Sequence, residues 1–252
     1  MIQLENITHV FAPGTVNENI ALRGLNLQIN EGDFITVIGS NGAGKSTLFN
    51  VISGTFPPSC GRIILKGKNV SKMPEYKRAK FIGRIYQNPL LGTSGNKSIE
   101  QNMALCSKKG FRGLCFTLNR SSRENYKKEL EVLEMGLEDR LKDSVGLLSG
   151  GQRQALTLLT TVMSRPDLLL LDEHTAALDP GNAEAVMKLT QHFISEYNMT
   201  AMMVTHNMQQ AITYGNRLLM MDKGNIILDI KGEEKADLTV AKLVEKFREL
   251  RT

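Results

Sequence analysis

The segment Gly39-Ser-Asn-Gly-Ala-Gly44-Lys45-Ser46-Thr47 decides how the rest of this chain is organised. It fits the pattern of a phosphate-binding loop, G-x-x-x-x-G-K-[S/T]. The flanking sequence agrees with this interpretation, because residues 34–38 predict a buried strand and residues 46–53 predict a helix. We therefore expect a strand, a phosphate loop and a helix in this order.

The residue types of this segment suit the binding of phosphate. Its glycines allow backbone dihedrals that a β-carbon would obstruct, so successive N–H groups can point into one concavity. Lys45 would carry a positive charge to the β and γ phosphates, Ser46 would offer a hydroxyl to Mg²⁺, and Thr47 would add a phosphate contact. The residues expected to bind phosphate are Gly39, Ser40, Asn41, Gly42, Ala43, Gly44, Lys45, Ser46 and Thr47.

The composition is that of an ordinary globular protein, with 252 residues, 41% of them hydrophobic and 23% charged. No apolar run approaches about 18 residues, so we expect a cytosolic protein with no membrane span of its own. The formal charge of +5 is modest, and no nucleic acid is expected as a partner. Because Cys60, Cys106 and Cys115 lack C-x-x-C spacing, we expect reduced thiols.

Hydrophobic periodicity predicts the remaining elements. We expect an antiparallel β layer from the first strands, a helical region from 98 to 145 with a capping box at 98–101, and Gly54 as the residue that ends the first helix. The predicted strands are 2–11, 25–29, 63–65, 82–86, 168–171, 200–205, 217–221 and 226–230. The predicted helical segments are 71–79, 129–137, 149–164, 180–197, 207–214 and 239–250.

A second helix start that suits an anion lies in the segment Leu148-Ser-Gly-Gly-Gln152. Ser149 is a natural N-cap, and Gly150 and Gly151 leave the N–H groups of the first turn unobstructed. One phosphate group does not ordinarily need two such anion-binding segments, or cradles, from one chain. The sequence therefore raises the question of what the second cradle binds.

Two carboxylates follow the apolar run 168–171, which suits a central parallel strand. Ligands of such sheets bind outside the carboxyl ends of the strands. Asp172 is placed to hold Mg²⁺, and Glu173 to take a proton from an attacking water. A pair of surface carboxylates at the start of a loop is the alternative, which the phosphate-binding segments disfavour.

Three further residues have both a structural and a functional interpretation. Phe11 could stack on an adenine ring or be a half-buried strand aromatic. Gln87 could be a ligand or a polar residue that ends a strand, and His206 could be catalytic or a capping group. The basic segment 108–128 is a solvated face or a surface that faces anionic lipid or an acidic partner.

The order of these motifs resembles the ATP-binding-cassette family of transport ATPases over essentially the whole chain. The segment 39–46 is similar to the Walker A loop, 148–152 to the signature sequence, and 168–173 to the Walker B strand with its catalytic glutamate. Gln87, Asp179 and His206 match the Q-loop, the D-loop and the switch histidine. Phe11 then becomes the adenine-stacking aromatic, where the family often has tyrosine.

The resemblance implies the fold and the domain organisation. The fold would be an α/β P-loop NTPase cassette with a mainly parallel core sheet, an antiparallel β layer and an inserted α-helical lobe. The chain would be a single nucleotide-binding domain over 1–252, with a core and β lobe at about 1–95 and 160–252 and a helical lobe at about 96–159.

The resemblance also implies the cofactors and the mechanism, with ATP and Mg²⁺ bound between two copies packed head to tail. The signature residues of one copy would then contact the γ-phosphate on the other, which accounts for the second cradle. The implied site residues are Glu173, His206 and Gln87 for catalysis, Ser46, Gln87 and Asp172 for Mg²⁺, and Phe11, Ser149, Gly150, Gly151 and Gln152 for the nucleotide.

The run 172–179, with 204–210, resembles a bacterial importer branch with amino-acid or related small-solute substrates. Implied partners are a separate permease, docked near 87–96 and on the helical lobe, and an extracytoplasmic solute-binding protein, with the chain on the cytoplasmic face of the membrane. A soluble cassette acting on DNA or the ribosome and an exporter's cassette are the alternatives. One departure is His174, where the family usually has proline; it either changes the loop backbone or titrates near the γ-phosphate.

Overall fold

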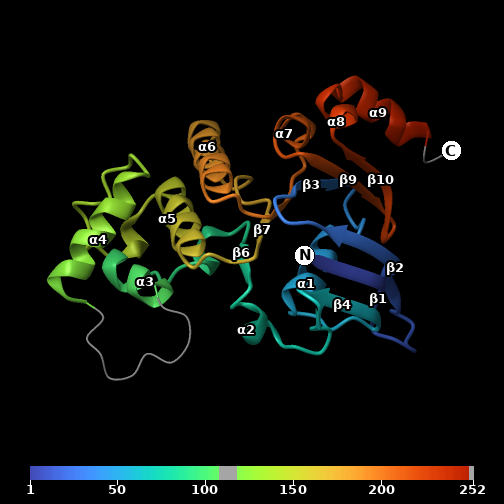
Figure 1. Ribbon diagram of the computed structural model, residues 1–252, viewed down its shortest axis with the longest axis horizontal. Helices are drawn as coiled ribbons and strands as arrows, with labels where there is room; N and C mark the ends of the chain where they lie inside the picture. Colours follow the sequence, from blue (N-terminus) through green and yellow to red (C-terminus); the bar gives the residue numbers. More distant parts are fainter. Residues whose placement is uncertain (108–117, 250–252) are drawn as a thin grey trace. The chain divides into compact units, whose positions relative to one another are not determined.

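The computed structural model describes residues 1–107 and 118–249 (Figure 1), which form two compact units. The first unit comprises the described residues of 1–82, 168–172 and 198–252, and the second comprises those of 83–167 and 173–197. The predicted helical lobe at about 96–159 lies inside the second unit. The division of the chain into a core and β lobe and a helical lobe stays a prediction.

The first unit contains two β-sheets and their covering helices. Its strands are β1 (Ile2–Phe11), β2 (Asn19–Ile29), β3 (Phe34–Gly39), β4 (Cys60–Leu65), β5 (Lys68–Asn69), β7 (Leu168–Asp172), β8 (Ala201–Val204), β9 (Arg217–Asp222) and β10 (Asn225–Lys231). Its helices are α1 (Lys45–Ser53), α2 (Glu75–Arg78), α7 (Met208–Thr213), α8 (Glu233–Ala236) and α9 (Val240–Glu249).

The pairing of the strands confirms the expected sheet types. The order β2-β1-β4-β5 forms an antiparallel layer, while β10-β9-β3-β8-β7 forms the core sheet within the first unit. Strand β3 pairs in parallel with both β8 and β9, and β7 pairs in parallel with β8. Only the hairpin of β9 and β10 is antiparallel among these core pairs. The carboxyl ends of β3, β8 and β7 therefore share one edge of the sheet.

The core sheet is buried on both faces. Along β9, Leu219 and Met221 belong to the apolar cluster shared with α1 and the antiparallel layer. Their neighbours Leu218 and Met220 belong to a second cluster shared with α7 and α9. Because successive side chains of a strand point to opposite faces, a continuous apolar run is what a strand covered on both sides requires. Figure 1 shows these helices flanking β3 and β9.

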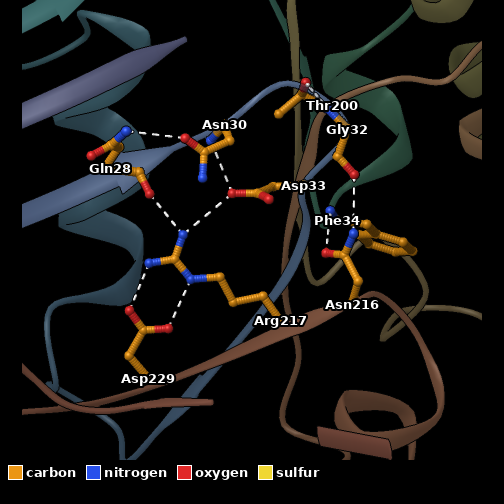
Figure 2. A network of polar contacts seen from close by, with 9 residues as sticks. All are labelled: Gln28, Asn30, Gly32, Asp33, Phe34, Thr200, Asn216, Arg217 and Asp229. Carbon is orange, nitrogen blue, oxygen red and sulfur yellow. Dashed lines mark hydrogen bonds and ion pairs between the residues drawn. The ribbon is translucent and has the colours of Figure 1, made fainter. Parts of the chain in front are cut away.

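A buried arginine joins the core sheet to the antiparallel layer (Figure 2). Arg217 of β9 donates to both carboxylate oxygens of Asp229 on β10, at 2.7 and 2.6 Å. It also donates to the Gln28 carbonyl on β2 at 2.7 Å and contacts Asp33 at 3.3 Å. Hydrogen bonding to Asp229 raises the pKa of the Arg217 guanidinium. The bidentate geometry favours Arg here over Lys.

A second buried arginine supports the helix that follows the phosphate loop. Arg78 is fully buried, and its guanidinium donates only to backbone carbonyls. Its acceptors are the carbonyls of Met73, Val51, Ile52, Val70 and Ser71, at 2.6 to 3.0 Å. Burial lowers the pKa of Arg78 to about 10. Two of these acceptors are in the last turn of α1, whose carbonyls have no partner within the helix.

The second unit is mainly helical. Its elements are β6 (Ile82–Ile85), on which the chain enters the unit, the 3₁₀ turns η1 (Pro89–Leu91) and η2 (Val145–Leu147), and the helices α3 (Ile99–Cys106), α4 (Arg120–Glu131), α5 (Gly150–Met163) and α6 (Pro180–Glu196). Helix α5 is the centre of the unit, because α3, α4 and α6 all pack against it. The predicted capping box of Ser98 and Gln101 is present at α3.

Two predicted helical segments were wrong in extent. The segment 71–79 is helical only from Glu75, because the Ser71 hydroxyl accepts from the Ile63 N–H at 2.8 Å and holds the chain beside β4. The run 129–137 is not one helix, since α4 ends at Glu131 and the chain turns at Glu134 with φ of 52°. Leu133 and Leu137 are still buried, so their spacing reflects a buried turn.

Other sequence predictions concern segments that are only partly described. Neither Cys60 nor Cys106 forms a disulfide within the described residues, and Cys115 lies outside them. The basic segment 108–128 is described only from 118 onward. Within 1–107 and 118–249, no helix is long and apolar enough to cross a membrane.

Candidate functional site

The phosphate loop connects β3 to α1 as predicted, and two of its glycines adopt left-handed backbone angles. Gly42 has φ of 78° and Gly44 has φ of 100°. A β-carbon on Gly44 would lie 2.6 Å from the Ala21 carbonyl oxygen of β2, whereas nothing lies within 4 Å of one on Gly42. Gly44 is thus required for both its conformation and the close approach of β2, and Gly42 for its conformation alone.

The loop lysine lies folded into the loop. Lys45 is 6% exposed, and its Nζ donates to the carbonyls of Gly39 and Ser40 at 2.8 and 3.0 Å. Ser40 in turn donates to Asp222 at 3.1 Å. A phosphate oxygen is a stronger acceptor for an ammonium group than a neutral carbonyl. The lysine is therefore held at the loop in a position from which it can transfer its hydrogen bonds to an anion.

The core sheet brings Asp172 and His206 to the same edge as the loop. Asp172 ends β7 and pairs in register with Val204 of β8, two residues before His206. Val204 lies on the strand adjacent to β3, opposite Val37. His206 lines a pocket of about 150 Å³ together with Gly39 and Ser40 of the phosphate loop. Three sequence-predicted site segments thus meet within the first unit.

Phe11, at the end of β1, lies near the loop through strand register. It pairs with Asn19 of β2, two residues before Ala21, whose carbonyl approaches Gly44. The Phe11 side chain is 36% exposed. Its ring contacts His9 and Phe56, with centroids 4.6 and 5.5 Å away. Sequence reasoning missed both partners, although His9 shares a strand face with Phe11 at spacing two.

The second cradle has the predicted capped helix start. Ser149 Oγ accepts from the Gln152 N–H at 3.2 Å, and the Gln152 side chain accepts from the Ser149 N–H at 3.2 Å. This reciprocal pair is a capping box at the start of α5. Ser149 and Gly150 are exposed. The N–H groups of the first turn that the box does not use remain directed beyond the helix end, where an anion is favoured.

Asp179 caps the next helix of the same unit. Its carboxylate accepts from the Asn182 backbone N–H at 3.1 Å and from the Asn182 side-chain amide at 2.6 Å. These hydrogen bonds lower the pKa of Asp179. Pro180 stands at the first helical position, as predicted.

Glu173 and Gln87 also belong to the second unit. Glu173 directly follows Asp172 and has φ of 48°, a left-handed angle that is uncommon for a non-glycine residue. Its carbonyl accepts from the Ala176 N–H at 2.9 Å, which closes a turn. Gln87 is exposed between β6 and η1. A strained residue at the end of a central strand is consistent with a functional position.

His174 is a buried core residue. It is 1% exposed, and its Nε2 lies 3.0 Å from the Thr190 hydroxyl of α6. Burial lowers the pKa of His174 to about 4. The side chain is therefore neutral at neutral pH and anchors the loop to α6. This environment favours a structural role for His174 over titration beside a phosphate.

The oxygen donors at the sheet edge fit Mg²⁺, provided that phosphate oxygens complete the coordination. Helix α1, which carries Ser46, packs against β7, which ends in Asp172. Hydroxyl and carboxylate oxygens are the ligands that Mg²⁺ prefers, usually with substrate phosphates and water. No group of three or more His, Cys, Asp or Glu side chains in 1–107 and 118–249 could hold a metal alone.

Comparison with known families accounts for this combination of motifs. The model of the ABC transporter family matches residues 22–176, a span from β2 through the phosphate loop and the signature helix to the residues after Asp172. The chain belongs to the ABC transporter family. The cassette fold is that of a P-loop NTPase, as the sequence predicted, and the chain is an ATPase.

Relatives match the cassette along almost its whole length. It is 40% identical to a tyrosine transport ATP-binding protein of Clostridioides difficile, over 98% of both chains. It is 32% identical to the energy-coupling factor transporter ATP-binding protein EcfA2 of Clostridium perfringens, covering 99% of this chain and 90% of that one. It is 31% identical to the phosphonates import ATP-binding protein PhnC of Lactobacillus acidophilus, covering 93% and 90%.

Solved structures agree with the sequence relatives. The cassette matches cbiO1 of Clostridium perfringens with a TM-score of 0.78 and 26% identity, over 98% of this chain and 94% of that one. It also matches a dimeric, post-hydrolysis ATP-binding cassette bound to ADP and Pi, with a TM-score of 0.76 and 25% identity, over 92% and 98%. ADP and Pi are the products of ATP hydrolysis, the reaction of this family.

Proposed function

We propose that this cassette is the ATP-hydrolysing, energy-coupling subunit of a bacterial small-solute importer. The main support is the 40% identity, over 98% of both chains, to a tyrosine transport ATP-binding protein. Further relatives are a phosphonates import ATP-binding protein and an energy-coupling factor transporter ATP-binding protein. An amino acid or a related small solute is the proposed substrate class.

The first unit would bind the nucleotide. Phe11 would stack on the adenine, the loop 39–47 would hold the phosphates, and His206 would contact the γ-phosphate. Mg²⁺, held by Ser46, Asp172 and Gln87, would neutralise charge on the β and γ phosphates. The shared edge of β3, β8 and β7 and the pocket that His206 lines with the loop support the assignments of the loop, Asp172 and His206.

The signature segment would act on a second copy of the chain. In a head-to-tail dimer, Ser149, Gly150, Gly151 and Gln152 of one protomer would bind the γ-phosphate on its partner, and Glu173 would take a proton from the attacking water. The capped, exposed start of α5 supports this role, because the positive end of a helix favours an anion. ATP would thereby join the two copies, and a monomer would hydrolyse slowly.

The permease would dock near 87–96 and on the helical lobe, at the cytoplasmic face of the membrane. Leu90 and Leu91 of η1 are 59% and 64% exposed, and Leu147 of η2 is 74% exposed. The Gly146 N–H donates to the Gly95 carbonyl at 2.8 Å, so η2 lies beside the loop that follows η1. Exposed apolar side chains from adjacent segments are typical of a protein interface. A solute-binding protein on the outer side would complete the importer.

Affinity purification of the chain from its native membranes tests the importer assignment. We expect to recover a multi-span permease and an extracytoplasmic solute-binding protein. The double variant Leu90→Glu/Leu91→Glu should lose the permease, whereas Val16→Glu, at an exposed position in the first unit, should retain it.

The other candidate functions predict different co-purifying proteins. Recovery of ribosomal or DNA-associated proteins without a permease would favour a soluble cassette. Recovery of a permease whose transport assay shows outward movement of solute would favour an exporter. Either result would overturn the importer assignment and leave the ATP chemistry intact.

A further inference from the structure

Three aromatic rings form a cluster at the end of β1. The rings of His9 and Phe56 are stacked, with centroids 5.3 Å apart and planes 9° from parallel. Phe11 stands nearly perpendicular to both, at 83° to His9 and 89° to Phe56. Edge-to-face arrangements at these separations are the favourable geometry for aromatic pairs. The orientation of Phe11 is therefore defined by two neighbours.

The two supporting rings are fixed more firmly than Phe11. His9 is 8% exposed, and its Nδ1 donates to the Pro57 carbonyl at 3.1 Å. Phe56 packs against the main apolar core, and its backbone N–H donates to the Asn50 carbonyl at 3.1 Å. Asn50 belongs to α1, the helix whose N-terminus forms the phosphate loop. The ring support and the phosphate loop thus share one helix.

We propose that His9 and Phe56 are positioning residues that hold the Phe11 ring ready to stack on the base of a bound nucleoside triphosphate. This inference rests on the proposed role of Phe11 at the adenine. An exposed aromatic without such support must lose side-chain rotamer freedom when the base binds. A ring that is already oriented avoids that loss. The cluster should therefore strengthen the binding of ligands that carry a base, and not of ligands that lack one.

The test compares a ligand with a base and a ligand without one. The probes are the slowly hydrolysed ATP analogue AMP-PNP and inorganic tripolyphosphate, each measured by calorimetry with Mg²⁺ on the full chain. Phe56→Leu and His9→Leu each place an apolar side chain at the position and remove one ring. Each should weaken AMP-PNP binding about 3- to 10-fold, the size of an aromatic pair contribution, and change tripolyphosphate binding less than about 2-fold.

The variants Phe56→Tyr and Phe11→Ala distinguish a failure of the positioning role from a failure of the adenine contact. Phe56→Tyr keeps the ring and should bind AMP-PNP as the natural chain does. The positioning role would be overturned if the Leu variants weakened the binding of AMP-PNP and of tripolyphosphate equally. It would also be overturned if both Leu variants kept the AMP-PNP affinity while Phe11→Ala weakened it. Either result would leave Phe11 as the residue that contacts the base. If Phe11→Ala itself leaves AMP-PNP affinity unchanged, the proposed adenine contact fails, and the positioning role with it.

Discussion

The side chain of Asn182 occupies the space beside Gly151, so that a β-carbon on Gly151 would lie 2.5 Å from Asn182 Oδ1. Asn182 cannot easily move aside, because its amide donates to Asp179 at 2.6 Å. The first turn of α5 and the first turn of α6 are therefore in direct contact. The glycine of the signature segment has a packing requirement that is independent of any nucleotide.

Gly151→Ala should destabilise the fold by about 1–3 kcal/mol, the usual cost of overpacking a tight contact. Asn182→Ala in the same chain should restore most of that loss, because it removes the atoms that the new methyl group meets. Gly150→Ala is the control, since its β-carbon would meet only the Leu178 side chain, at 3.4 Å. Denaturant unfolding of the natural chain, Gly151→Ala, Asn182→Ala and the double variant gives the coupling energy, and additive effects would contradict the contact.

Replacing Arg78 by Met should cost roughly 2–4 kcal/mol of unfolding free energy, because buried carbonyls would lose their donors. Arg62→Met is the matched control. Arg62 pairs with Glu5 at 3.0 Å, but its side chain is 68% exposed, so its loss should cost less than about 1 kcal/mol. Denaturant unfolding of both variants compares the two costs. Equal costs would mean that the carbonyl contacts of Arg78 contribute little.

Local patterns in the sequence predicted much of this structure. Contacts between residues far apart in the sequence could not be predicted from it. The phosphate loop and the caps at Ser149 and Asp179 were predictable, because each is specified within a few adjacent residues. The end of α4 was not, since Leu133 keeps the helical spacing while lying in a buried turn. Arg78 gave no signal, because its partners are backbone carbonyls, which every residue carries.

Glu173→Gln should slow ATP hydrolysis by about 10²- to 10⁴-fold, the contribution of a positioned general base, and should leave ATP binding intact. The variant keeps the size of the side chain and removes its ability to take a proton. An ATP-bound dimer should therefore accumulate, which size-exclusion chromatography with light scattering would detect. Glu184→Gln, at an exposed residue paired with Lys188, should behave as the natural chain. Wild-type turnover by Glu173→Gln would exclude the residue as the base.

His174 should make the stability of the cassette depend on pH below about 6.5. Its pKa falls from 6.5 to about 4 on burial, so between these values the unfolded chain binds the proton and the folded chain does not. The stabilisation is fully present above the unfolded pKa and is lost as pH falls toward about 4, by about 3 kcal/mol in total. Unfolding free energies measured from pH 7 to pH 4 give this slope.

The contribution of His174 is isolated by comparing variants, because other groups also titrate in this range. His174→Gln keeps a polar group beside Thr190 but cannot titrate, so its stability should fall less steeply with acid than that of the natural chain. His192→Gln, at an exposed position of the same helix α6, is the matched control for the exchange of a histidine for glutamine. Since the imidazole is buried and contacts the Thr190 hydroxyl, the His174→Gln effect should appear equally with and without nucleotide. A slope that changed only when AMP-PNP is bound would instead connect His174 to the phosphates.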